Sequence, residues 1–161
     1  MEHPQAKYMQ RAIREAKRAG RMGQYPLGAV VVQNTKIISI AHTTLHGDHD
    51  PSAHAEMNAI RIAAKKKKSR YLHGAWLYTT QEPCPMCVSA AIWAKMEGVV
   101  FGAGKDDALK IYRKNKGKKF TWRQIDISAR VIIAKGEPKL KLVGRFLRKE
   151  CLELLDIFGV E

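Results

Sequence analysis

Two short motifs in this chain contain three potential zinc ligands, and together they limit the folds that the chain can adopt. One motif is His54-Ala55-Glu56, and the other is Pro83-Cys84-Pro85-Met86-Cys87. One imidazole and two thiolates suit Zn²⁺, and three protein ligands leave one of its four tetrahedral positions open, as in catalytic sites. The fold must therefore bring His54, Cys84 and Cys87 together around one Zn²⁺ per subunit. Glu56, beside a ligand, is then expected to carry protons for a zinc-bound water.

Both motifs are expected near the N-terminus of a helix. Asp50 suits an N-cap and Pro51 a first helical position, which predicts a helix over residues 51–66. Glu82-Pro83 predicts a second helix over residues 83–95, with Cys84 and Cys87 on one face. The positive end of a helix dipole favours thiolate and neutral imidazole, the forms that bind a metal.

Two other interpretations of the motifs stay open. A redox pair would explain Cys-x-x-Cys but would leave the motif at His54 unexplained. A structural zinc would need a fourth ligand. Candidates for that ligand are His42, His46, His49, His73 and Cys151. Cys151 is expected instead to be a buried thiol, because leucines surround it at helical spacing.

The chain resembles the zinc-dependent cytidine deaminase superfamily, and within it the guanine deaminases and tRNA adenosine deaminases. Residues 50–61 and 77–87, which contain the two motifs, carry most of the resemblance. It implies a three-layer α/β/α fold with a five-stranded mixed sheet, hydrolytic release of ammonia from a nucleobase or nucleoside, and a homodimer. Glu56 would be the catalytic acid and base, without being a zinc ligand.

The same resemblance suggests the residues that contact substrate. Asp107 matches an acid of guanine deaminases that helps to move protons, with Asp106 as the alternative register. Thr43 stands where both relatives usually have a substrate-binding Asn, and a hydroxyl cannot replace the donor and acceptor pair of an amide. Ala55 and Trp93 complete the expected substrate contacts.

A guanine deaminase-like activity is the prediction favoured by Trp93 and the Asp107 segment, while cytosine and cytidine remain open as substrates. The first alternative is a tRNA adenosine deaminase, which the charge of the chain favours. The second is a non-catalytic RNA-binding module held together by zinc. Such a module would have no use for the carboxylate of Glu56.

The composition indicates one basic domain over residues 1–161. Lys and Arg number 29 against 15 acids, and the net charge is +14. This excess suits RNA or a nucleotide phosphate, although an ordinary solvated surface would also explain it. No apolar run is long enough for a membrane span, and neither a signal peptide nor a disulfide framework is indicated, so the cytoplasm is expected. The basic residues cluster at Arg61, Lys65–Lys68 and Arg70, and at Lys105, Lys110, Arg113, Lys114, Lys116, Lys118 and Lys119.

Helices and strands are expected to alternate along the chain. A helix at the start and a hairpin about residues 33–35 precede βαβ units, which predicts a mixed sheet covered on both faces. Trp122 lies in a segment that is expected either to pack or to stack on a base. The expected helices cover residues 4–22, 51–66, 83–95, 106–116 and 144–158, and the expected strands cover 27–32, 37–41, 75–80, 98–102 and either 131–134 or 140–143.

Overall fold

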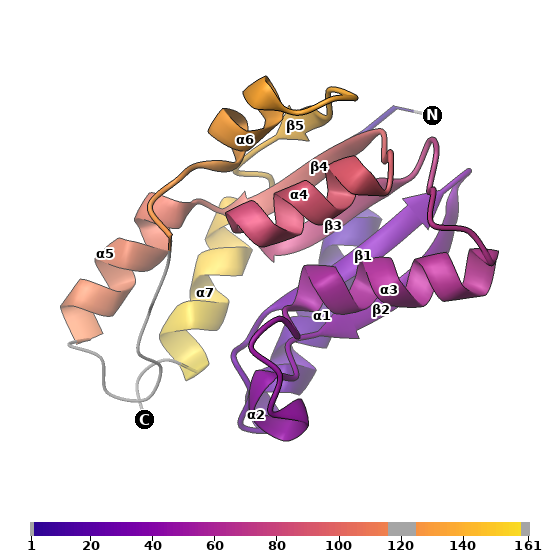
Figure 1. Ribbon diagram of the computed structural model, residues 1–161. Helices are drawn as coiled ribbons and strands as arrows, with labels where there is room; N and C mark the ends of the chain where they lie inside the picture. Colours follow the sequence, from indigo (N-terminus) through magenta and orange to yellow (C-terminus); the bar gives the residue numbers. More distant parts are fainter. Residues whose placement is uncertain (1, 116–124, 159–161) are drawn as a thin grey trace.

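The computed structural model describes residues 2–115 and 125–158, which form one five-stranded sheet with helices on both faces (Figure 1). The strand order is β2-β1-β3-β4-β5. Trp122 and the expected basic residues Lys116, Lys118 and Lys119 lie outside the described residues. The elements are α1 (Ala6–Arg21), β1 (Gly28–Gln33), β2 (Lys36–His42), α2 (Leu45–Asp48), α3 (Ala55–Lys67), β3 (Trp76–Gln81), α4 (Pro85–Trp93), β4 (Gly98–Ala103), α5 (Lys105–Asn115), α6 (Ala129–Lys135), β5 (Lys141–Val143) and α7 (Arg148–Phe158).

The sheet is mixed, as the sequence predicts. Strand β1 is antiparallel to both β2 and β3, whereas β3, β4 and β5 run parallel. The turn between β1 and β2 contains Asn34 and Thr35, both with positive φ, as tight hairpin turns require. Because of these directions, the C-terminal ends of β2, β3 and β4 and the N-terminal end of β1 meet at one edge of the sheet.

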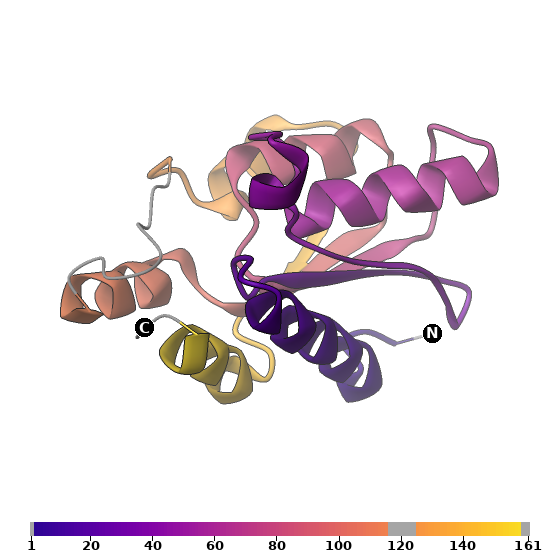
Figure 2. The ribbon, with the colours of Figure 1, turned by 90° about the horizontal axis from the view of Figure 1, so that it is seen from below.

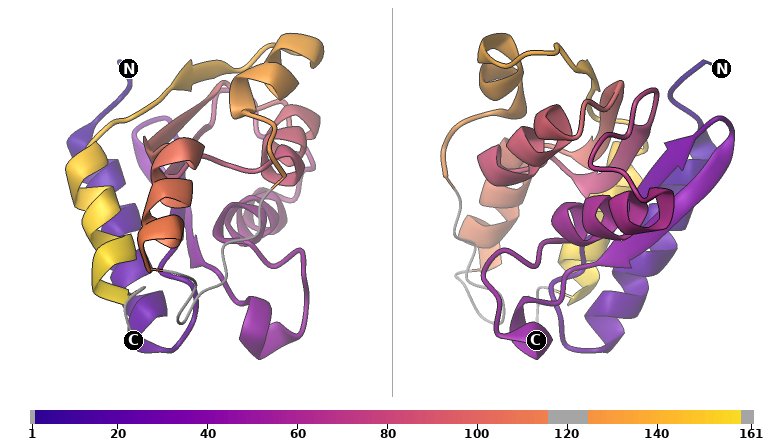
Figure 3. Two further views of the ribbon diagram at one scale, coloured as in Figure 1. Left: turned by 90° about the vertical axis from the view of Figure 1, so that its left-hand side faces the viewer. Right: turned by 45° about the vertical axis from the view of Figure 1, so that its right-hand side comes forward.

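Helices α3, α4 and α6 lie on one face of the sheet, and α1 and α7 lie on the other (Figure 2). Side chains alternate between these faces: Leu77 packs with Ala59 and Val88 under α3 and α4, whereas Tyr78 packs with Met9 of α1. Helix α5 lies beside α7 (Figure 3). The result is the three-layer α/β/α arrangement that the resemblance implies.

Both ligand helices begin later than expected. Asp50 does not cap α3; its carboxylate accepts hydrogen bonds from the Ser52 amide (2.8 Å) and hydroxyl (2.7 Å), which closes a turn before the helix. His54 has an extended backbone, and α3 starts at Ala55. Likewise, α4 starts at Pro85, two residues after the expected start.

Three other expectations need correction. Residues 131–134 belong to helix α6, so of the two predicted final strands the segment at 140–143 is the correct one. The last helix begins at Arg148 because Arg145 and Leu147 have positive φ, which an α-helix does not accommodate. The short helix α2 was not expected. In the described part of the chain, the helices are all too short or too polar to cross a membrane.

Candidate metal centre and catalytic site

Two helix starts and one strand end place the metal ligands. His54 is the N-cap of α3, Cys84 is the N-cap of α4, and Cys87 lies in the first turn of α4. The carbonyls of His54 and Cys84 accept the first hydrogen bonds of their helices, from Asn58 (2.9 Å) and Val88 (3.0 Å). The ligand side chains therefore project from the first turns of the two helices, at the edge of the sheet where β3 ends.

The distances among the ligand atoms fit one zinc ion. His54 Nδ1 lies 3.6 Å from the Sγ atoms of both Cys84 and Cys87, and the two sulfurs are 3.6 Å apart. With ordinary zinc–sulfur and zinc–nitrogen bonds, a tetrahedral ion would separate such ligands by about 3.6–3.8 Å. The three residues are thus positioned to bind a metal ion.

A closed structural site finds no support in the described residues. No fourth His, Cys, Asp or Glu joins the group of three there. His42 instead pairs with Glu15 (2.8 Å), His46 stacks on the ring of Tyr25, and Cys151 belongs to the core on the α1 and α7 face. Three ligands leave one tetrahedral position for water or substrate.

Hydrogen bonds within the group adjust its protonation. The hydrogen-bonded contact with the Cys87 sulfur, followed by that with His54, lowers the pKa of Cys84 to about 4. The Cys84 contact raises the pKa of His54, and the hydrogen bond to Cys84 and burial raise the pKa of Cys87. One thiolate is therefore already stable, and a metal ion would displace the remaining protons.

Glu56 lies in the first turn of α3, in position to act beside the ligands. Its side chain is buried, with 6% of the residue exposed, and Thr79 of β3 donates a hydrogen bond of 3.2 Å to its carboxylate. Burial raises the pKa of Glu56. A buried carboxyl with raised pKa, held by one hydroxyl, suits proton transfer. The catalytic role of Glu56 stays a prediction.

Thr43 and Ala55, two expected substrate contacts, are both buried. Thr43 directly follows β2, its amide donates to the carbonyl of Leu27 (3.2 Å), and 0% of the residue is exposed. Its hydroxyl oxygen has no partner among the described residues. Ala55 is the first residue of α3 and packs in the core under that helix. The unpartnered hydroxyl suits the predicted contact with substrate.

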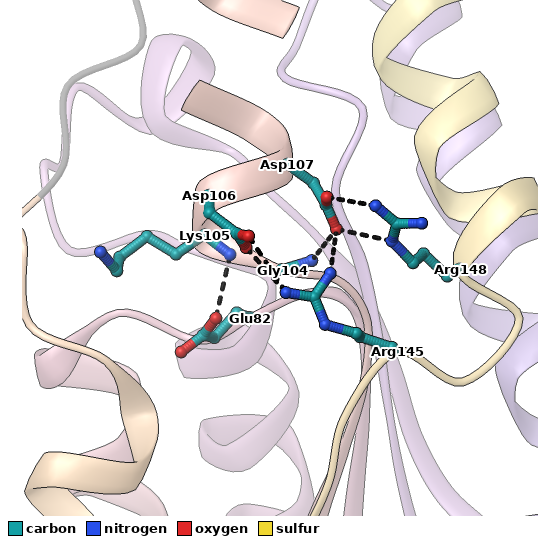
Figure 4. Close-up of polar contacts among 7 residues, drawn as sticks. All are labelled: Glu82, Gly104, Lys105, Asp106, Asp107, Arg145 and Arg148. Carbon is teal, nitrogen blue, oxygen red and sulfur yellow. Dashed lines mark hydrogen bonds and ion pairs between the residues drawn. The ribbon is translucent and has the colours of Figure 1, made fainter. Parts of the chain in front are cut away.

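Asp107 is engaged by the chain itself (Figure 4). Its carboxylate accepts hydrogen bonds from the Gly104 amide (3.0 Å), from Arg145 (3.0 Å) and from Arg148 (2.6 and 2.9 Å), and 3% of the residue is exposed. The Arg148 contact is the main reason that the pKa of Asp107 falls to about 2. Asp106 also pairs with Arg145. These contacts join α5 to α7, and the predicted catalytic role of Asp107 gains no support from them.

Glu82 is a positioning residue that sequence reasoning missed. Its carboxylate accepts a hydrogen bond from the backbone amide of Lys105 (2.9 Å), at the start of α5 (Figure 4). It also accepts one from the amide of Ala129 (3.0 Å), at the start of α6. Its own amide donates to the carbonyl of Ala103 (2.7 Å). Since Glu82 immediately precedes Pro83-Cys84, these bonds fix the chain that leads into the ligand helix. The signal in the sequence was an acid directly before the Cys motif.

Trp93 lies at the C-terminal end of α4, the end opposite to Cys84, and is 81% exposed. Its side chain faces solvent, so its predicted contact with substrate stays a prediction without structural support. The basic cluster at the end of α3 is exposed as well. Over the length of α3, about 20 Å separates those lysines from the metal ligands.

Comparison with known proteins agrees with this geometry. The model of the cytidine and deoxycytidylate deaminase zinc-binding region matches residues 2–103, which include all three ligands. The chain belongs to this deaminase family. The tRNA-specific adenosine deaminase of Aquifex aeolicus is 45% identical over 96 residues, which are 60% of this chain and 64% of that protein. The guanine deaminase of Bacillus subtilis is 42% identical over 83 residues, which are 52% and 53% of the two chains.

A structural neighbour of this deaminase-family chain comes from a study of A-to-I editing by tRNA:A34 deaminases at the wobble position of tRNA. It superposes with a TM-score of 0.74 at 26% identity, over 94% of this chain and all of the neighbour. The aligned segments span less than two thirds of the length of the Aquifex and Bacillus relatives. The family is thus established for this zinc-binding domain.

Proposed function

We propose that this chain is a zinc-dependent hydrolytic deaminase of an aminated nucleobase, and that adenosine in tRNA is the first candidate for its substrate. The ligand geometry carries the proposal: three ligand atoms lie 3.6 Å apart, and a buried carboxylate lies two residues after one of them. A redox pair would need neither His54 nor Glu56. A zinc-held binding module would not need Glu56.

Zinc, when bound, lowers the pKa of a coordinated water towards about 7 and acts as a Lewis acid. Glu56 takes a proton from the attacking water and passes it to the ring nitrogen beside the carbon that bears the amine. It then delivers the second water proton to the amine, which leaves as ammonia while the carbonyl forms. Thr79 orients the Glu56 carboxylate through its 3.2 Å hydrogen bond.

The choice of tRNA adenosine over guanine reverses the order favoured by the sequence. That order depended on Trp93 and Asp107, and the structure leaves Trp93 in solvent and Asp107 in ion pairs. The net charge of +14 and the identity to the Aquifex tRNA enzyme favour the RNA substrate. Guanine is the second candidate because of the Bacillus guanine deaminase. We propose a cytoplasmic location, because tRNA and reduced cysteines occur there. We also propose a homodimer, which the resemblance to the deaminase superfamily implies.

Ammonia release tests the proposal. Zinc-loaded protein is incubated with tRNA, adenosine, guanine, cytosine and cytidine, beside the variant Glu56→Gln. We expect inosine in tRNA and ammonia from the native protein, and a loss of at least about 10³-fold in kcat for the variant, which keeps its zinc. Guanine turnover alone would favour the second candidate. A variant as active as the native protein would contradict the role of Glu56, and RNA binding without any turnover would favour the binding module.

A further inference from the structure

Two buried polar atoms lack a hydrogen-bond partner among the described residues: Thr43 Oγ1 and Gln81 Oε1. Thr43 is fully buried, and 6% of Gln81 is exposed. Almost all buried polar atoms in folded proteins are satisfied, so each exception calls for an explanation. Elsewhere on the same sheet the buried hydroxyl of Ser39 does have a partner, the carbonyl of Ala59 at 2.7 Å.

The two unpartnered atoms belong to one row across the sheet. Ala29 of β1 pairs with Ala41 of β2 and with Thr79 of β3. Continuing this register by two residues, back from Ala29 and onward from Ala41 and Thr79, sets Leu27 between Thr43 and Gln81. The hydrogen bond from the Thr43 amide to the Leu27 carbonyl (3.2 Å) confirms one side of this row. Strands are about 4.8 Å apart, so the backbones of Thr43 and Gln81 are about 10 Å apart.

The row lies on the face of the sheet that α3 and α4 cover, at the edge of the sheet where the metal ligands lie. Thr79 points to α3, where it contacts Glu56, and alternation along β3 directs Gln81 to the same face. Gln81 is closer than Thr79 to the C-terminal edge of the sheet, where Cys84 follows. Likewise, His42 faces α1 through Glu15, so Thr43 faces α3.

We propose that Gln81 is a base-binding residue that determines specificity, and that its amide and the Thr43 hydroxyl bind opposite edges of one planar nitrogen heterocycle above Leu27. The proposal rests on the proposed function in that this heterocycle is the base presented to the metal centre. A separation of about 10 Å accommodates a purine-sized ring with a hydrogen bond at each side. Because an amide offers both a donor and an acceptor, Gln81 selects bases by the groups on the edge that it meets.

The variant Gln81→Met tests this assignment, because Met keeps the approximate volume and removes both polar groups. Its Tm should be unchanged or higher, since the Gln81 oxygen makes no internal hydrogen bond that the substitution could remove. Binding of adenosine and of guanine is measured by equilibrium dialysis on zinc-loaded Glu56→Gln protein, with and without Gln81→Met. We expect the affinity for the bound base to fall about tenfold or more while zinc content stays the same.

Ser39→Ala is the matched control, since Ser39 is also buried and faces α3. It lies four residues before Thr43, further from the edge of the sheet where the metal ligands lie. The control substitution should lower the Tm by loss of a satisfied hydrogen bond and leave base affinity unchanged. Unchanged affinity in Gln81→Met, or no binding of either base, would overturn the assignment, as would a fall in Tm without a change in affinity. The native protein could release no ammonia although base binding depends on Gln81. That result would refute the proposed function, while the assignment of the base site would stand.

Discussion

His54 and Cys84 each begin a helix and each offer a ligand atom to the same metal ion. At the scale of single residues, this arrangement makes ligand geometry independent of flexible loops. The backbone of each residue is extended, and its carbonyl accepts the first hydrogen bond of the following helix. The backbone from which each of these side chains projects is therefore fixed by the helix that the residue starts.

Replacing one sulfur ligand should remove the metal. We expect Cys84→Ser to retain far less than one zinc per subunit, because a serine hydroxyl does not ionise near neutral pH and binds zinc weakly. Cys151→Ala is the control, since this thiol lies on the other face of the sheet. Elemental analysis of dialysed protein measures both. Full zinc in Cys84→Ser would contradict the ligand assignment.

Residue chemistry explains how much of the site the sequence could predict. The ligands were identifiable because few other side chains bind zinc and because their spacing suits two helix starts. The partners of Asp107 were not, since Arg145 and Arg148 lie 38 and 41 residues away in the sequence. Gln81 was missed for a different reason: a polar atom is known to lack a partner only when its whole surroundings are placed.

At the scale of elements, the ion pairs of Asp107 hold α5 against α7. Arg148 is a residue of α7, and Arg145 lies in the segment before it, so one carboxylate fixes the start of α5 to the last helix. The Glu82 carboxylate likewise joins the chain before α4 to the starts of α5 and α6. These two acids connect the starts of α5 and α6 to their neighbours in the chain around the metal centre.

Removing the charge of Asp107 should destabilise the fold. The pKa of Asp107 is about 2 in the folded protein, against 3.8 without its partners. Ionised Asp107 therefore contributes about 2 kcal/mol above pH 3.8, and this contribution disappears as pH falls from 3.8 towards 2. Asp107→Asn should lower the free energy of unfolding by about 2 kcal/mol at pH 7 and flatten its dependence on pH in that window. Urea unfolding at several pH values measures both. An unchanged dependence of the unfolding free energy on pH would argue against a stabilising role of the Asp107 ion pairs.

Local competition explains the errors in the predicted elements. Asp50 could cap a helix or close a turn. It closes a turn, because its carboxylate accepts hydrogen bonds from the Ser52 amide and hydroxyl. The run Val131–Ala134 has the β-branched residues of a strand, but Ala129 and Ile133 pack one helical turn apart against the core. Periodicity over so few residues does not separate the two structures.

At the scale of the whole molecule, the basic surface and the metal centre are separate features. The lysines at the end of α3 lie about 20 Å from the ligands, at the far end of that helix. An extended polyanion can contact both, whereas a free base reaches only the metal centre. The overall topology was predictable because a hairpin followed by βαβ units permits few arrangements.

The salt dependence of tRNA binding tests the role of this surface. The double variant Lys65→Ala, Lys67→Ala should weaken tRNA binding and lower the slope of log K against log salt by about one for each phosphate that the variant no longer binds. Turnover of a free base should stay unchanged. Lys139→Ala is the control, since Lys139 already pairs with Glu137 and with backbone carbonyls. An equal slope in the native protein, the double variant and the control would indicate that these lysines form a solvated surface and do not bind tRNA phosphates.

The position of the ligands at the starts of α3 and α4 has a consequence for how the protein loses its metal. A chelator that withdraws the ion would release both first turns together, because the atoms that hold the ion belong to the residues that anchor those turns. Chelation would act as a denaturant confined to one edge of the sheet. Amides near the beginning of the two helices would exchange with deuterium sooner, while those in the central strands would keep their protection.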